Sequence, residues 1–167
     1  LVAALVAAVA REWAARELPP PRLIVEPGRA LVSPAGVTLY RVGALKHAGA
    51  RRYAAIDGGM SDNPRPQLYR GRYAALLAER AGEEAAGDFT IAGKHCESGD
   101  VLIERVSLPE PRRDDLLAVP VTGAYTLAMS SNYNGVPRPA AVLVRDGEAR
   151  LILRRESVED LLAREPG

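Results

Sequence analysis

Apolar residues fill the start of the chain and then give way to short runs separated by turns. Residues 1–10 are wholly apolar, and Glu12 and Arg16 follow with the i,i+4 spacing of an ion pair on a helix. The three prolines at 19–21 cannot continue a helix. The pattern therefore predicts a buried or half-buried helix that ends at Leu18.

A second apolar run, Leu23–Val25, is short and stops at Pro27-Gly28. Such a run is typical of a fully buried strand. A helix, a loop, a buried strand and a glycine turn follow one another in α/β units, where ligand-binding residues come just after the carboxyl end of the strand. We therefore expect one such unit here, followed directly by ligand-binding residues.

The pattern changes after Pro34-Ala35-Gly36 to short strands separated by regular turns. Asp146-Gly147 is a strong hairpin signal between the last two of them. Strands are predicted at 37–42, 53–56, 89–92, 101–106, 116–121, 141–144 and 149–153. This arrangement predicts a mainly β domain, either a barrel or a sandwich.

Short helices are predicted at 125–131 and 157–164. Ser157 suits the N-cap of the second helix and Asp160 suits its first turn. Residues 80–88, rich in Ala, Gly and Glu, predict an exposed connection.

Composition and charge exclude several classes of protein. A chain of 167 residues suits one domain, or one domain plus a fragment of another. With 22 basic and 21 acidic residues the net charge is +1, which gives no field to attract nucleic acid or a membrane surface. The apolar start is shorter than the roughly 18 to 20 residues of a membrane span, and it has no basic region typical of a signal peptide. The absence of an initiating Met indicates the tail of a longer protein.

The single cysteine excludes an internal disulfide and indicates a reducing cytoplasm. Neither Cys96 nor the two histidines, His47 and His95, have the spacing of a metal site. We therefore expect no structural metal.

The block Lys94–Asp100 places a thiol, a carboxylate and a hydroxyl side by side in front of a glycine turn. A lone cysteine is typically a buried hydrophobe, but the polar and charged neighbours of Cys96 favour an accessible thiol. A thiol with a pKa of about 8.5 is mostly protonated near neutral pH and can donate a proton. Cys96 is therefore a candidate general acid.

Three further segments contain candidate site residues, and each residue also has a purely structural interpretation. Gly28 allows backbone N–H groups to approach a phosphate, but the same turn also suits a plain connection from a strand to a helix. Arg65 lies between two prolines, so a stiff loop displays a guanidinium that suits a carboxylate; the alternative is a surface arginine in a turn. Tyr125, after Gly123-Ala124, is either a core tyrosine or a site residue.

Taken together, these segments resemble the C-terminal half of the diaminopimelate decarboxylases, a family of pyridoxal-phosphate enzymes of lysine biosynthesis. The resemblance runs from about Leu23 to Leu162. Its motifs, in the family's order, are Glu26-Pro27-Gly28-Arg29, Asp57-Gly58-Gly59-Met60, Asn63-Pro64-Arg65-Pro66 with Leu68-Tyr69, Gly93 to Asp100, Gly123-Ala124-Tyr125, Ser131-Asn132-Tyr133-Asn134, Arg138-Pro139-Ala140 and Arg155-Glu156.

The resemblance implies a role for each candidate residue. Cys96 is implied to protonate the substrate α carbon after CO2 leaves. The other implied roles are binding of the distal carboxylate by Arg29, Arg65 and Tyr69, binding of the distal ammonium by Glu97 with Ser98, contact with substrate by Tyr125, and binding of pyridoxal 5′-phosphate by Glu26, Gly28, Arg29 and Tyr125.

Other residues of the shared motifs carry no implied chemistry. We expect Tyr133 and Asn134 to hold their loop together, and Asp57 and Asp62 to build turns. Related decarboxylases that act on precursors of simple diamines carry an aspartate in place of Glu97-Ser98. A substrate with both a distal amine and a distal carboxylate therefore fits this sequence better.

The resemblance also implies a domain organisation and an oligomeric state for the intact enzyme. Residues 1–35 correspond to the last helix and strand of a pyridoxal-phosphate-binding (β/α)8 barrel, and residues 36–167 to a β domain. The family's Schiff-base lysine lies in the N-terminal barrel, and neither Lys46 nor Lys94 stands in a matching context. We therefore expect the chain alone to be inactive and the intact enzyme to be a homodimer with shared active sites. The alternatives are a related decarboxylase with another diamino acid substrate, or a non-catalytic dimerising β domain.

Overall fold

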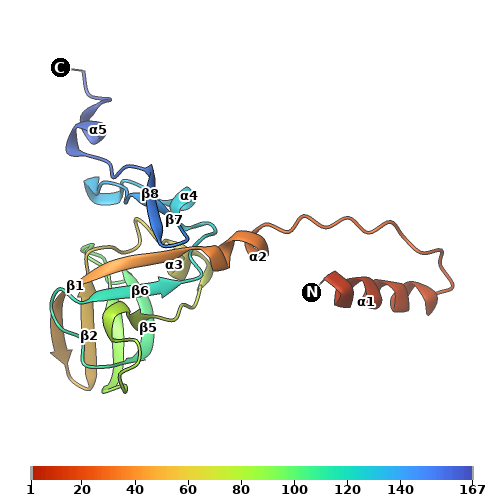
Figure 1. Cartoon of the computed structure of the whole chain (residues 1–167), viewed down its shortest axis with the longest axis horizontal. Coiled ribbons are helices and arrows are strands. Elements are labelled where there is room, and N and C mark those ends of the chain that lie inside the picture. The colour runs from red at the N-terminus through yellow and green to blue at the C-terminus, as the bar shows by residue number, and fades with distance from the viewer. Residues whose placement is uncertain (1, 167) are drawn as a thin grey trace.

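The computed structural model describes residues 2–166, and most of them are built around one six-stranded sheet (Figure 1). The strand order is β3-β6-β1-β2-β4-β5. Neighbouring strands are antiparallel except for the parallel pair β2 and β4. The strands are β1 (Val37–Ala48), β2 (Arg51–Ile56), β3 (Leu76–Leu77), β4 (Gly87–Ala92), β5 (Val101–Leu108) and β6 (Leu116–Pro120). The mainly β fold is confirmed.

The core lies against the middle of this sheet. Val42 on β1, Ile91 on β4 and Leu117 on β6 are fully buried. On β4 three consecutive residues, Phe89 to Ile91, are buried, as expected for a strand covered on both faces. The Arg52 guanidinium covers one side by lying 4.1 Å from the centre of the Phe89 ring. This packed centre gives the loops at the strand ends a rigid base.

A separate hairpin joins β7 (Ala141–Arg145) and β8 (Glu148–Leu153). Its two-residue turn has φ of 52° at Asp146 and 82° at Gly147. Positive φ at both central residues is the requirement of a type I′ turn, which favours the Asp-Gly pair. The hairpin prediction is confirmed.

The helices are short apart from the first. They are α1 (Val2–Ala14), α2 (Arg29–Val32), α3 (Arg65–Tyr69), α4 (Thr126–Met129) and α5 (Val158–Leu162), with single 3₁₀ turns η1 (Ser33–Ala35), η2 (Ala78–Arg80) and η3 (Tyr133–Gly135). At α5 the Ser157 side chain accepts from the Asp160 amide while the Asp160 carboxylate accepts from the Ser157 amide. This capping box confirms the predicted helix start. No helix in residues 2–166 has the length and apolarity to cross a membrane.

Two predictions for the start of the chain are wrong in this structure. Residues 23–25 form no strand, and their side chains are exposed, Ile24 by 70%. Helix α1 buries no residue and ends at Ala14, before Glu17 turns to a positive φ of 55°. A strand needs a neighbour for its hydrogen bonds and an apolar helix face needs a surface to cover. Figure 1 shows α1 held away from the sheet by a long extended segment, so residues 2–166 provide neither.

A third correction concerns the predicted connection at 80–88. Gly87 and Asp88 belong to β4 and pair with Leu108 and Ser107 on β5. Asp88 accepts hydrogen bonds from Ser107 Oγ and Arg105 Nε, both at 2.5 Å. Cross-strand partners distant in sequence therefore extend the strand beyond its apolar run.

Candidate active site

The cysteine-bearing loop connects β4 to β5 and is fastened by Asp100, which is 3% exposed. The Asp100 carboxylate accepts the amide of His95 at 2.9 Å and the amide of Met60 at 2.7 Å. One buried carboxylate thus joins the cysteine loop (residues 93–100) to the glycine loop (residues 57–64). Hydrogen bonds to an ionised acceptor are about twice as strong as neutral ones, so this junction is stiff.

Two glycines make room for this carboxylate. A Cβ at Gly93 would lie 2.0 Å from Asp100 Oδ2, and one at Gly59 would lie 2.5 Å from the same atom. Gly59 also has a φ of 157°, which side-chain-bearing residues rarely adopt. The glycines of these two motifs are therefore needed for close approach to Asp100.

Asp62 and Tyr40 stabilise the glycine loop through hydrogen bonds. The Tyr40 hydroxyl donates to Asp62 Oδ2 at 2.6 Å, and the Gly59 amide donates to Asp62 Oδ1 at 2.8 Å. Burial raises the pKa of Asp62, and burial together with the Asp62 charge raises the pKa of Tyr40. Asp57 accepts the Arg41 amide at 2.8 Å. Asp62 thus builds the turn, as expected, while Asp57 ties the start of the loop to β1.

Cys96 and Glu97 are exposed at the tip of the cysteine loop, and both contact η3. The Asn134 amide lies 3.9 Å from Cys96 Sγ, and the Tyr133 hydroxyl donates to Glu97 Oε1 at 2.5 Å. The hydrogen bond to Glu97 raises the pKa of Tyr133. Tyr133 and Asn134, which were expected to hold their loop together, thus also contact the cysteine loop.

His95, which is buried, connects the cysteine loop to the glycine loop and to η3. It is 8% exposed, and its Nε2 lies 2.9 Å from Ser61 Oγ. The His95 ring meets the Tyr133 ring edge-on with centroids 5.5 Å apart. No role was predicted for His95, Ser61 or Asp100, because their contacts join residues up to 40 positions apart.

A second group of predicted residues lies where α2 meets the loop after β6. A Cβ at Gly28 would lie 2.2 Å from the Tyr125 hydroxyl, and Arg29 Nη1 donates to the Ala124 carbonyl at 2.7 Å. The connection is locked by Ser33, whose hydroxyl donates to the Val121 carbonyl and whose carbonyl accepts the Gly123 amide. Gly28, Arg29 and Tyr125 are thus brought together. Glu26 stays exposed on the extended segment before them.

A third group lies on α3. The Arg65 guanidinium stacks over the Tyr69 ring with Cζ 5.2 Å from the centroid. Gln67 Nε2 donates to the carbonyls of Gly99 and Val101 at 3.0 and 3.1 Å, which fixes α3 to the end of the cysteine loop. Among residues 2–166, no hydrogen bond links Cys96 directly to Arg29 or Arg65, and the tie between α3 and the cysteine loop runs through Gln67.

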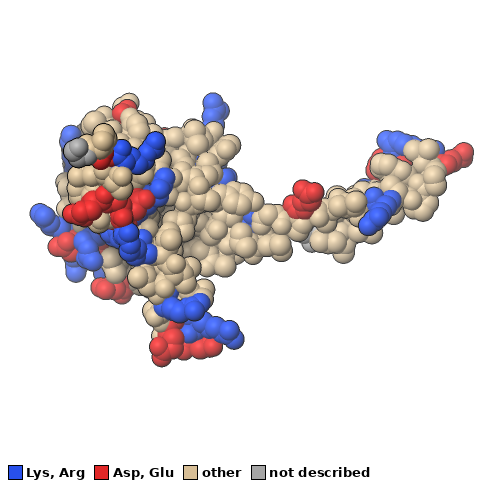
Figure 2. All heavy atoms as spheres, turned by 90° about the horizontal axis from the view of Figure 1, so that it is seen from above, with Lys and Arg blue, Asp and Glu red and all other residues tan. Residues whose placement is uncertain are grey.

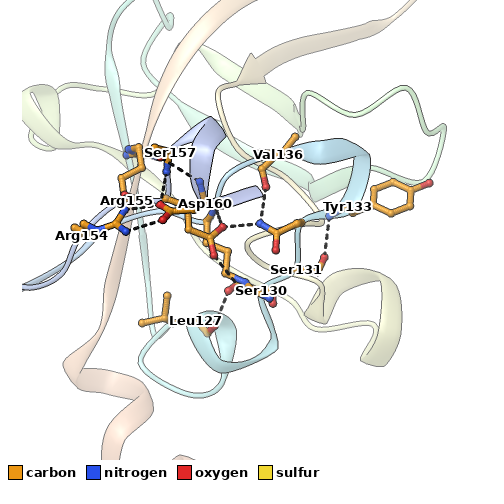
Figure 3. Close-up of polar contacts among 12 residues, drawn as sticks. Leu127, Ser130, Ser131, Tyr133, Val136, Arg154, Arg155, Ser157 and Asp160 are labelled. Carbon is orange, nitrogen blue, oxygen red and sulfur yellow. Dashed lines mark hydrogen bonds and ion pairs between the residues drawn. The ribbon is translucent and has the colours of Figure 1, made fainter. Parts of the chain in front are cut away.

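The segment that carries η3 is held by a polar network. Glu156 accepts hydrogen bonds from the Arg138 amide at 2.8 Å, from Asn132 Nδ2 at 2.5 Å and from Arg138 Nη1 at 3.0 Å, and these bonds, the first above all, lower the pKa of Glu156. Figure 3 labels the neighbouring Ser157–Asp160 cap and Ser131, whose hydroxyl accepts the Tyr133 amide, and it shows the Tyr133 side chain extending away from the cap. The motif residues Asn132, Arg138 and Glu156 are therefore structural supports.

A groove of about 700 Å³ lies between the α3 region and β5. Ser98 contributes to it, but Cys96, Arg29 and Arg65 do not. The lining residues are Pro66, Gln67, Arg70 to Tyr73, Ser98, Gly99 and Val101 to Arg105. Most of the predicted site residues thus lie on more open surface outside the groove.

Charge is mixed over the sheet body. Figure 2 shows acidic and basic side chains side by side on the face it presents, with a largely uncharged stretch leading toward α1. Within the part of the chain that the structure describes, no three His, Cys, Asp or Glu side chains gather in a group able to hold a metal.

The sheet domain and its cysteine loop are similar to those of a known protein family. The family model described as the C-terminal sheet domain of pyridoxal-dependent decarboxylases matches residues 29–123, a stretch that contains the cysteine loop. The chain belongs to the pyridoxal-dependent decarboxylase family. The match begins at Arg29 and ends at Gly123, so it spans the whole six-stranded sheet.

Relatives named diaminopimelate decarboxylase are similar over nearly the whole chain. One from Actinosynnema pretiosum subsp. auranticum is 60% identical over 159 residues, which are 95% of this chain and 36% of that protein. A crystal structure of a diaminopimelate decarboxylase superposes with a TM-score of 0.80 at 40% identity, covering 95% of this chain and 40% of that one. The Helicobacter pylori enzyme, complexed with L-lysine, gives a TM-score of 0.78 at 32% identity over 87% of this chain and 36% of that one.

These findings confirm the resemblance to diaminopimelate decarboxylases. They also show that the chain spans little more than a third of the length of the relatives it matches, 36% in the case of the Actinosynnema protein. The decarboxylase relationship is thus established for a C-terminal portion.

Proposed function

We propose that this chain is the C-terminal part of a decarboxylase that converts meso-2,6-diaminopimelate to L-lysine and CO2. The observation that carries the proposal is the cysteine loop, which presents the Cys96 thiol next to the Glu97 carboxylate at an exposed tip on a rigid base. The similarity to diaminopimelate decarboxylases over 95% of the chain supports the choice of substrate.

Pyridoxal 5′-phosphate fits the group formed by α2 and the loop after β6. The absence of a side chain at Gly28 is what lets the Tyr125 hydroxyl come so close to the backbone, and a phosphate is best held by backbone N–H groups with a hydroxyl nearby. We assign this role to Gly28, Arg29 and Tyr125, together with the preceding Glu26. The chemistry that the cofactor supplies when bound is an electron sink for the carbon that loses CO2.

Arginine and tyrosine side chains are assigned to the non-reacting end of the substrate. Arg65, stacked on Tyr69, and Arg29, tied to the Ala124 carbonyl, each keep N–H donors for a carboxylate. A guanidinium binds a carboxylate with two parallel hydrogen bonds, which gives direction as well as charge. Glu97, with Ser98, is assigned to the distal ammonium, and Tyr125 to contact with substrate as well as cofactor. These contacts orient the α carbon for decarboxylation.

Cys96 is assigned as the general acid. When CO2 has left, the α carbon carries an electron pair, and the Cys96 S–H donates its proton to that carbon to form the new C–H bond. Its exposed position at the loop tip allows the sulfur to reach a substrate. Proton donation of this kind contributes about 100- to 10,000-fold to a rate.

The chain alone is proposed to be inactive, because it holds only Lys46 and Lys94 and both lie outside the group assigned to the cofactor. The reactive lysine is assigned to an N-terminal (β/α) barrel, with residues 1–35 as the end of that barrel. Borohydride reduction of the 167-residue chain with one equivalent of pyridoxal phosphate should give no stoichiometric adduct on Lys46 or Lys94 by mass spectrometry. A stoichiometric reduced adduct on one of these two lysines would contradict this assignment.

The intact enzyme is proposed to be a cytoplasmic homodimer with active sites shared between subunits. The cysteine loop connects two strands of the sheet, and the side-chain hydrogen bonds of its tip residues, Cys96 and Glu97, go only to η3 among the described residues. Such a tip suits a site completed by a second subunit in an isologous arrangement.

Substrate choice is tested by assaying the whole enzyme, the barrel joined to this chain, against meso-diaminopimelate, ornithine, arginine and lysine. We expect kcat/KM for diaminopimelate to exceed the others by at least about 100-fold, because each of the others lacks a group that the assigned arginines or Glu97 bind. A preference for ornithine or arginine would indicate a related decarboxylase instead. CO2 release from none of them would indicate a non-catalytic domain.

A further inference from the structure

We propose that Tyr133 is a positioning residue that fixes the Glu97 carboxylate for the substrate's distal ammonium and so helps the enzyme to select substrates with a second amino group. This inference rests on the proposed function and deepens it, since it names the element that orients one of its binding groups.

The contact between the two side chains is direct and specific. The Tyr133 hydroxyl donates to Glu97 Oε1 at 2.5 Å, although the two residues are 36 positions apart in sequence. An ordinary phenol is already protonated at neutral pH, and this hydrogen bond raises the pKa of Tyr133 further. The phenol therefore supports the carboxylate as a hydrogen-bond donor.

Glu97 needs such support because it lies on an exposed loop tip. A free glutamate side chain loses substantial rotamer entropy when it is fixed on a ligand. Tyr133 fixes one carboxylate oxygen before substrate arrives. An ionised carboxylate is an acceptor with two oxygens, so Oε2 stays open for the ammonium.

Tyr133 is itself firmly held. Its ring meets the buried His95 ring, and His95 contacts Ser61 Oγ at 2.9 Å. Ser131, two residues before Tyr133, also bonds to the glycine loop, because its amide donates to the Ser61 carbonyl at 2.8 Å. The glycine loop therefore supports both partners of the Tyr133–Glu97 contact, through His95 on one side and Ser131 on the other.

The test is steady-state kinetics of the whole enzyme with Tyr133→Phe, which removes only the hydroxyl. We expect KM for diaminopimelate to rise about tenfold with kcat within about twofold, since a hydrogen bond to a charged group contributes this order of binding energy. The second substrate is 2-aminopimelate, which has the distal carboxylate but no distal amine. For 2-aminopimelate we expect the variant and the parent enzyme to agree within about twofold.

Two comparisons separate positioning from a general structural effect. Tyr53→Phe, the same deletion on β2, should change neither substrate's kinetics. In a Glu97→Gln background, Tyr133→Phe should add little further loss, because the charge it positions is already absent.

The outcomes are distinct. Equal losses with both substrates, full additivity with Glu97→Gln, or no change in Tyr133→Phe would each overturn the role of Tyr133 while leaving the decarboxylase assignment intact. Failure of the parent enzyme to release CO2 from diaminopimelate would instead overturn the proposed function.

Discussion

Replacing Cys96 with alanine lowers the kcat of the whole enzyme by about 100- to 10,000-fold, with KM for diaminopimelate nearly unchanged. The expected loss follows from the removal of the proton donor to the α carbon, while the groups assigned to the two ends of the substrate stay in place. The measurement is CO2 release under saturating substrate and cofactor.

The matched control for this variant is Ser107→Ala. It also removes one polar atom from an exposed side chain, but on β5, where the hydroxyl donates a hydrogen bond to Asp88 and to no other of residues 2–166. We expect the control to keep the parent kcat. A Cys96→Ala enzyme with a kcat within about threefold of the parent would remove the thiol from the mechanism.

Mixing two inactive subunits restores activity if the site is shared. One subunit carries Cys96→Ala and the other carries a substitution of the barrel's Schiff-base lysine. Random pairing makes half of the dimers mixed, and each mixed dimer has one intact site, so we expect about a quarter of the parent activity.

Each inactive homodimer, mixed only with itself, serves as the control for this recovery. Subunit exchange is verified by native mass spectrometry of the two chains. No recovery in verified mixed dimers would show that Cys96 acts within its own subunit.

Local sequence signals predicted the parts of the fold that depend on neighbours along the chain. The type I′ hairpin follows from Asp146-Gly147, whose residues tolerate positive φ, and the start of α5 follows from Ser157 and Asp160. In both cases the deciding interactions span at most a few residues.

The sequence was less informative where the deciding partner lies far away. Leu23–Val25 has the composition of a buried strand but has no neighbour among the described residues, so composition alone does not produce a strand. Gly87 and Asp88, by contrast, read as a loop and become strand through pairing with β5.

In the candidate site, too, residues with local sequence signals were predicted and residues with distant partners were not. Cys96 and Glu97 were found because a thiol and a carboxylate at one turn are unusual, and Arg65 because two prolines frame it. Asp100 was missed as a support, and Tyr133 was expected to hold its loop but not to contact Glu97, since their partners Met60 and Glu97 lie 40 and 36 positions away. The glycines at 59 and 93 were a usable signal, because each leaves space for one buried carboxylate.

The most direct measurement is the decarboxylation of meso-diaminopimelate by the whole enzyme in D2O, with CO2 quantified and lysine analysed by mass spectrometry and NMR. The proposed function predicts one lysine per CO2, with a single deuterium on the carbon that lost its carboxylate, delivered from the exchanged Cys96 thiol. Absence of CO2, or release of CO2 without lysine, would contradict it.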